Sequence, residues 1–109
     1  MQFAVISRAQ DSSNIPIPAQ LMMVEKTFEL LKSKADPRIK ESYGFAGERA
    51  GILIVEAESG DELTEVLANL PFFNLTKNEI HPISSIDSAL SSVRQAQARF
   101  TQMTPAGVG

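Results

Sequence analysis

The chain has no cysteine and only one histidine, His81. Without cysteine it can form no disulfide framework, thiolate zinc site or iron–sulfur cluster, and it has no cysteine nucleophile. One imidazole per chain also excludes a histidine-rich metal site or a two-histidine relay within one chain. We therefore expect a protein that works without a cofactor.

Excess positive charge and long apolar runs are also lacking. Ten basic residues stand against 13 acidic ones, for a net charge of −3, which argues against a nucleic-acid-binding surface. The first residues lack the basic start and apolar run of a signal peptide, and no stretch approaches the ~18 apolar residues of a membrane span. These features predict a cytoplasmic protein with no nucleic-acid or membrane partner.

The length of 109 residues and the 43% hydrophobic content suit one globular domain. We assign residues 1–103 to that domain. Residues 104–109 combine proline and glycine with little apolar content, so we expect a flexible tail there.

Three segments show helical periodicity. Residues 17–34 carry an apolar stripe with spacings of three and four, after prolines suited to a first helical turn. Ser59 and Glu62 form a capping box for a second helix over 60–70, which Pro71 ends. A third helix begins after Ser84 or Ser85, and its apolar residues recur as far as Met103.

Four segments are strand candidates: residues 2–8, 38–45, 49–57 and 72–81. In the second, alternation places Ile39, Glu41, Tyr43 and Phe45 on one face. In the third, residues 52–55 are apolar on both faces, which predicts a central strand covered on both sides.

The element order β-α-β-β-α-β with an added C-terminal helix predicts a ferredoxin-like α+β fold with an antiparallel sheet. In this fold both crossover helices cover the same face of the sheet. The economical cover for the other face is a second copy of the chain, so we predict a homodimer joined sheet to sheet, with higher oligomers open.

Residues 51–86 resemble the muconolactone isomerase family. The shared features are an apolar strand, Gly51–Ala57, the segment Leu70-Pro71-Phe72-Phe73 after a helix, and a strand ending in His81-Pro82-Ile83-Ser84-Ser85-Ile86. Ile83 is inserted into the His-Pro-Ser-Ser-Ile pattern of the family. The resemblance implies a dimeric α+β barrel and a cofactor-free isomerase that shifts a double bond in an unsaturated lactone.

Such a reaction needs a general base and a group that stabilises the developing enolate oxygen. The residues that we consider for the base are Glu56, Glu79 and His81. Those that we consider for substrate binding are Arg8, Tyr43, Arg49, Phe72 and Phe73. Alternation along the last strand puts Glu79 and His81 on one face, where they would titrate as a coupled pair.

Each candidate also has a structural interpretation. Lys77, Glu79 and His81 suit the solvated face of an edge strand. Glu56 either marks the end of its strand at the surface or is buried with a raised pKa, with Arg8 and Arg49 as ion-pair partners. Two other functions remain open: a non-catalytic ligand-binding or assembly module, and a cofactor-independent monooxygenase.

Overall fold

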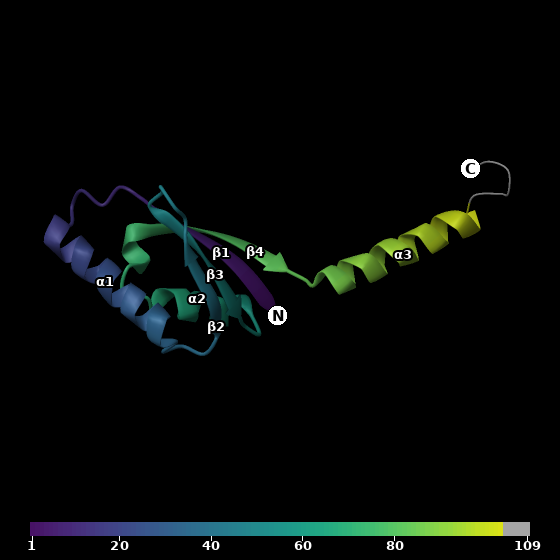
Figure 1. Cartoon of the computed structure of the whole chain (residues 1–109), viewed down its shortest axis with the longest axis horizontal. Helices are drawn as coiled ribbons and strands as arrows, with labels where there is room; N and C mark the ends of the chain where they lie inside the picture. The colour runs from purple at the N-terminus through teal and green to yellow at the C-terminus, as the bar shows by residue number, and fades with distance from the viewer. Residues whose placement is uncertain (104–109) are drawn as a thin grey trace.

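A computed structural model describes residues 1–103, which form four strands, three α-helices and one short 3₁₀ helix (Figure 1). In chain order the elements are β1 (Gln2–Ala9), α1 (Ile17–Ser33), β2 (Ile39–Gly44), β3 (Ala50–Glu56), α2 (Gly60–Ala68), the 3₁₀ helix η1 (Phe73–Leu75), β4 (Thr76–Ile83) and α3 (Ile86–Met103). The order confirms the predicted β-α-β-β-α-β arrangement with an added C-terminal helix. The tail that we expected at 104–109 lies outside the described residues.

The strands form one antiparallel sheet in the order β2-β3-β1-β4. β3 is central, as its two-sided apolar pattern predicts, and β1 is central as well, whereas β2 and β4 are the edges. Both α1 and α2 lie against one face, which we call the inner face. We call the opposite face, which no helix of the described chain covers, the outer face.

The hydrophobic core lies between the inner face and α2. Alternate residues of the central strands, such as Val5 and Val55, are fully buried there, and Val66 of α2 packs against them. Ile6 and Ile54 point to the outer face and are only half-buried. The apolar residues of the central strands are therefore divided between a covered face and a bare one.

The predicted cap of α2 is present. The Ser59 hydroxyl accepts the backbone N–H of Glu62 at 3.2 Å, and the Glu62 carboxylate accepts the N–H of Glu58 at 2.9 Å. The reciprocal bond thus reaches one residue further back than in the usual capping box. At the other helix, α1 ends at Ser33, because Lys34 adopts the left-handed conformation with φ of 54°.

Two predicted strands differ from the structure. The segment 72–81 is not a strand throughout: Phe73–Leu75 form a 3₁₀ turn, since the N–H of Leu75 donates to Phe72 O, and β4 runs from Thr76 to Ile83. In β2 a bulge lies between Ile39 and Glu41, so Ile39 is buried on the inner face while Glu41 shares the outer face with Tyr43. Of the predicted common face of Ile39, Glu41, Tyr43 and Phe45, only Glu41 and Tyr43 therefore share a face, and Phe45 lies beyond the end of the strand.

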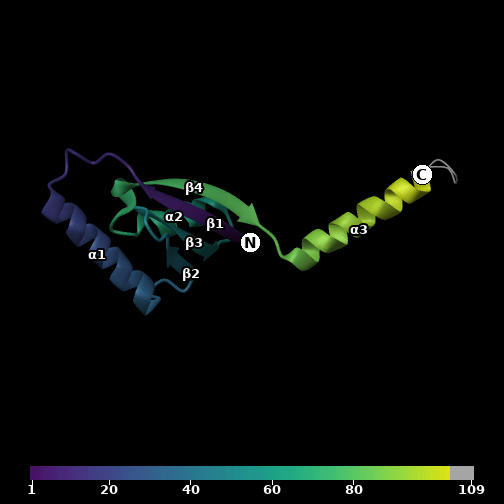
Figure 2. The ribbon, with the colours of Figure 1, turned by 45° about the horizontal axis from the view of Figure 1, so that its top comes forward.

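Helix α3 extends away from the sheet and from the other two helices (Figures 1 and 2). It gives the molecule a longest dimension of 69 Å against 26 Å and 25 Å for the others. None of the helices within residues 1–103 combines the length and the apolar content needed to cross a membrane.

Candidate functional site

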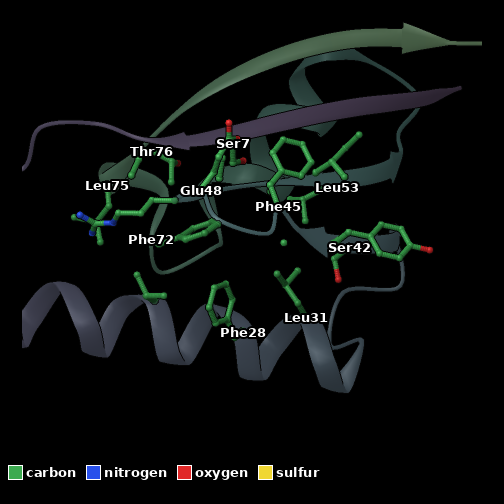
Figure 3. A pocket seen from close by; sticks show the side chains of 18 of the residues that line it. Ser7, Phe28, Leu31, Ser42, Phe45, Glu48, Leu53, Phe72, Leu75 and Thr76 are labelled. Carbon is green, nitrogen blue, oxygen red and sulfur yellow. The ribbon is translucent and has the colours of Figure 1, made fainter.

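A pocket of about 740 Å³ opens between α1 and the inner face of the sheet. Phe28 and Leu31 rise from α1 toward the sheet, and Phe45 and Leu53 face them from the other wall (Figure 3). The walls are mostly apolar, and Phe28 is 58% exposed despite facing the sheet side, because the space beneath it is open. A pocket of this size suits a small organic molecule.

The pocket exists because one row of cross-strand neighbours on the inner face has small side chains. Gly44, Gly51 and Ser7 are paired in register across β2, β3 and β1, and Asn78 of β4 completes the row. The next row holds the bulkier Leu53 and Val5. At Gly51 a Cβ atom would lie 2.6 Å from the carbonyl oxygen of Tyr43, so the strands approach too closely there for any side chain.

Polar groups line the sheet side and the rim of this pocket. The buried Ser7 hydroxyl donates to Asn78 Oδ1 at 2.6 Å, which fixes its position in the floor. Three charged residues, Lys32, Glu48 and Arg49, contribute to the rim. Arg8 Nη1 lies 3.4 Å from Glu48 Oε2 and orients that carboxylate. The pocket thus combines an apolar cavity with one buried hydroxyl, one carboxylate and two cations.

Three of the residues that the sequence suggested line this pocket: Arg49, Phe72 and Tyr43. Tyr43 is paired with Ile52, so its side chain belongs to the outer face and is 60% exposed. Phe73 packs against the hydrophobic core instead. Arg49 and Phe72 are therefore the suggested residues whose side chains suit a role in the pocket.

The suggested bases lie elsewhere. Glu79 and His81 are paired with Ile6 and Ala4, which places both on the outer face. His81 Nε2 is 3.4 Å from Glu79 Oε1, so the structure brings these two groups together, and both are more than half exposed. Neither residue lines the α1 pocket.

Glu56 also lies on the outer face, where its carboxylate accepts a hydrogen bond of 2.8 Å from the Met1 amine. This bond lowers the pKa of Glu56 and raises that of the amine. Of the two interpretations of Glu56, the buried carboxylate with a raised pKa is therefore wrong, since the side chain is partly exposed at the end of its strand. So is the expected ion pair with Arg8, which contacts Glu48 instead.

Sequence reasoning missed Ser7 and Glu48. Ser7 did carry a signal, because it continues the alternation of Phe3 and Val5 and is the one polar member of that buried face. Glu48 lies in the turn between β2 and β3 and carried none. Within residues 1–103 no cluster of three histidine or carboxylate side chains could hold a metal ion.

Comparisons with known proteins bear on this fold. A family model described as muconolactone delta-isomerase matches residues 3–89. No sequence among curated proteins matches the chain. The crystal structure of a muconolactone isomerase superposes with a TM-score of 0.65 at 17% identity, over 78% of this chain and 90% of that one. This likeness shows that the two chains share a fold.

A second solved structure is the 5-chloro-2-hydroxyhydroquinone dehydrochlorinase of Burkholderia phenoliruptrix AC1100, in complex with 2,5-dihydroxybenzoquinone. It matches with a TM-score of 0.49 at 22% identity, over 77% of this chain and 94% of that one.

Proposed function

From the premise that this chain belongs to the muconolactone delta-isomerase family, we propose that it is a cofactor-free isomerase whose substrate binds in the α1 pocket. The substrate class is a small unsaturated lactone or related carboxylic acid. The proposal rests on one observation: a carboxylate, two cations and a buried hydroxyl all line the same apolar cavity.

The reaction moves one proton between two carbon atoms of the substrate. We assign the proton carrier to Glu48, which takes the proton from the carbon beside the carbonyl group and returns it at the far end of the conjugated system. We propose that the Ser7 hydroxyl turns its single proton from Asn78 Oδ1 to the enolate oxygen that forms between these steps. No electron leaves the substrate, so the reaction requires no redox partner.

Arg49 and Lys32 account for the substrate class. A guanidinium and an ammonium group at the rim favour a ligand with a carboxylate, and a guanidinium can bind it with two parallel hydrogen bonds. Phe28 and Phe72 supply apolar walls for the ring. We propose that the carboxylate stays at the rim while the reacting carbons enter the cavity.

The outer face offers a second location for the same reaction. Glu56, Glu79 and His81 share that face with Arg8, and they would enclose a cavity only if a second copy covered the sheet. We propose such self-association through the outer face, because its half-buried centre, Ile6 and Ile54 included, has no cover in one chain.

Proton exchange distinguishes the two locations. In deuterated water, an active isomerase incorporates deuterium into an unsaturated lactone, and NMR follows the incorporation. We expect Glu48→Gln to reduce the exchange rate by about 100-fold or more, as for loss of a general base. Glu41→Gln, which removes an exposed carboxylate of the outer face, is the matched control and should change little.

Variants of the outer face test the alternative location of the reaction. If Glu79→Gln, His81→Ala or Glu56→Gln abolishes exchange while Glu48→Gln does not, the reaction takes place between two copies and the assignment to the α1 pocket is wrong. Absence of exchange across a panel of lactones, together with NMR shifts at Ser7 and Phe72 on ligand addition, would identify a binding module. Oxygen consumption without a cofactor would identify a monooxygenase.

A further inference from the structure

Helix α3 exposes an apolar side that no described part of the chain covers. Ile86, Val93 and Phe100 are 82%, 55% and 72% exposed, and the helix points away from the sheet (Figures 1 and 2). Most of the stability of a protein helix such as α3, which has 18 residues, comes from packing of its apolar side. From residue 90 onward it also lies beyond the residues that the family model matches.

Most of the apolar residues of α3 follow a seven-residue repeat, and Leu90 lies beside it. Ile86, Val93 and Phe100 occupy one position of the heptad, and Ala89 and Ala96 occupy the position three residues later. This 3.5-residue period keeps one narrow seam in line along a helix, which is the pattern of two helices that pack along their lengths. The partner that the pattern suits is another long helix, not a flat sheet.

We propose that α3 packs antiparallel against α3 of a second copy of this chain. In one register Phe100 of one copy lies opposite Ala89 of the other and Val93 lies opposite Ala96, so these two large residues each meet a small one, while position 86 falls opposite position 103 at the helix ends. The same contacts then form in both directions, as a two-fold axis requires. The part of α3 from Ala89 to Phe100 is thus sterically complementary to itself in this orientation.

The parallel orientation lacks this fit. It would set Phe100 against Phe100 and Ala89 against Ala89, which crowds the seam at Phe100 and leaves a gap at Ala89. Antiparallel packing also brings the positive end of each helix dipole to the negative end of its neighbour. Of the two arginines, neither Arg94 nor Arg99 occupies a seam position.

This proposal goes beyond the isomerase function and does not rest on it. The α3 seam is separate from the outer face of the sheet, so the two surfaces can be tested one at a time. If both pair, each chain contacts two different copies and the assembly is larger than a dimer.

The first test measures the mass of the full chain in solution by light scattering across micromolar concentrations. We expect Val93→Glu to lower the average mass by half, because it places a charge in the seam. Ser91→Glu changes the charge equally on the opposite side of α3 and should keep the mass of the unaltered chain. Equal masses for the two variants, or a monomeric unaltered chain, would overturn the proposal.

The second test determines orientation and uses the absence of native cysteine. Chains with Ala89→Cys and chains with Phe100→Cys carry different tags and are mixed under mild oxidation. Antiparallel pairing predicts a disulfide between the two kinds of chain, and none between two Ala89→Cys chains. In an antiparallel pair, the cysteines of two Ala89→Cys chains would lie about 16 Å apart along the helix axis, at 1.5 Å per residue.

The remaining outcomes contradict the proposal. Disulfides between two Ala89→Cys chains would show parallel packing. If Val93→Glu lowers the mass but no disulfide forms in the mixture, α3 contacts a different surface of the second copy. Far-UV circular dichroism of each variant verifies that the sheet and the other helices remain folded.

Discussion

The two faces of the sheet have similar apolar centres but different surroundings. On the inner face, Leu53 and Val55 are buried beneath the helices, whereas on the outer face the adjacent Ile52 and Ile54 are half-buried and uncovered. On the inner face one row of paired residues, which includes Ser7 and Gly51, has small side chains, and the pocket lies over that row. On the outer face the central strands carry large apolar side chains, and the edge strand β4 carries charged residues.

This difference distinguishes a ligand-binding face from an association face, which the sequence alone does not tell apart. A face with a gap under a helix can hold a ligand, whereas a filled and uncovered face suits association with another protein surface. Alternation along β3 assigns apolar residues to both faces equally. Only the residues opposite them determine which face becomes a pocket.

The largest effect that we expect separates Leu53 from its neighbour Ile54. Leu53→Ala removes a side chain that is 4% exposed and should lower the free energy of unfolding by about 2–4 kcal/mol. Ile54→Ala, on the outer face of the same strand, should cost about 1 kcal/mol in the monomer because its side chain is half-solvated already. Urea denaturation at low protein concentration measures both, and equal losses would contradict the contrast between the faces.

Association through the outer face provides the second prediction. Ile6→Lys places a charge in the centre of that face and should weaken self-association by about 100-fold or more, since a buried unpaired charge is strongly unfavourable. The free energy of unfolding of the monomer should change little. Sedimentation velocity over a dilution series measures the effect.

The control for this variant is Lys40→Glu, which alters charge on an exposed edge residue of β2. A dissociation constant that is the same for Ile6→Lys and the unaltered chain would show that the outer face is not an interface.

The fold could be predicted from the sequence further than the site. Stripes such as that of α1 and the Ser59–Glu62 cap depend on neighbours along the chain, so the helices and the order of elements along the chain follow from local patterns. The bulge after Ile39 and the turn at Phe73 depend on packing against distant residues, and alternation alone missed both.

The site was harder for the same reason. The functional candidates were chosen by chemical type, and Glu79 and His81 were selected because their side chains can act as general bases. The pocket arises instead from the small side chains of Gly44, Gly51 and Ser7. These three residues are brought together only by the register of the strands.

The third prediction concerns how α1 is attached over the inner face. Thr27 is fully buried, and its hydroxyl accepts the N–H of Phe72 at 3.0 Å while donating to Met23 O at 2.8 Å. Thr27→Val keeps the shape but leaves the Phe72 N–H without its acceptor, so it should cost about 1–3 kcal/mol. Thermal unfolding measures the loss.

Thr64 of α2 offers a matched control. Its hydroxyl makes the same bond to the carbonyl four residues earlier, Gly60 O at 3.0 Å, but the residue is exposed and holds no second element. Thr64→Val should therefore change stability by less than about 0.5 kcal/mol. A similar loss in both variants would mean that the Thr27–Phe72 bond does not hold α1 in place.

The smallest effect should come from the loop between α1 and β2, at the edge of the inner face. The Asp36 carboxylate accepts three bonds from Arg38, from its backbone N–H at 3.0 Å, Nε at 3.0 Å and Nη2 at 2.9 Å. The hydrogen bond from the Arg38 side chain lowers the pKa of Asp36. We expect Asp36→Asn to cost about 0.5–1 kcal/mol at pH 7, as for a well-formed but partly exposed ion pair.

The sign of the pH dependence follows from the lowered pKa. A carboxylate whose pKa is lower in the folded than in the unfolded chain adds stability above the unfolded value, near 4. That contribution is lost as the pH falls through the folded pKa, so the unaltered chain and Asp36→Asn should converge in acid. Asp11→Asn is the control, because Asp11 Oδ1 accepts the Ser13 N–H and forms no ion pair in the part of the chain described. A difference for Asp36→Asn that persists unchanged at low pH would show that the geometry of the loop, and not the charge on Asp36, provides the stability at this edge.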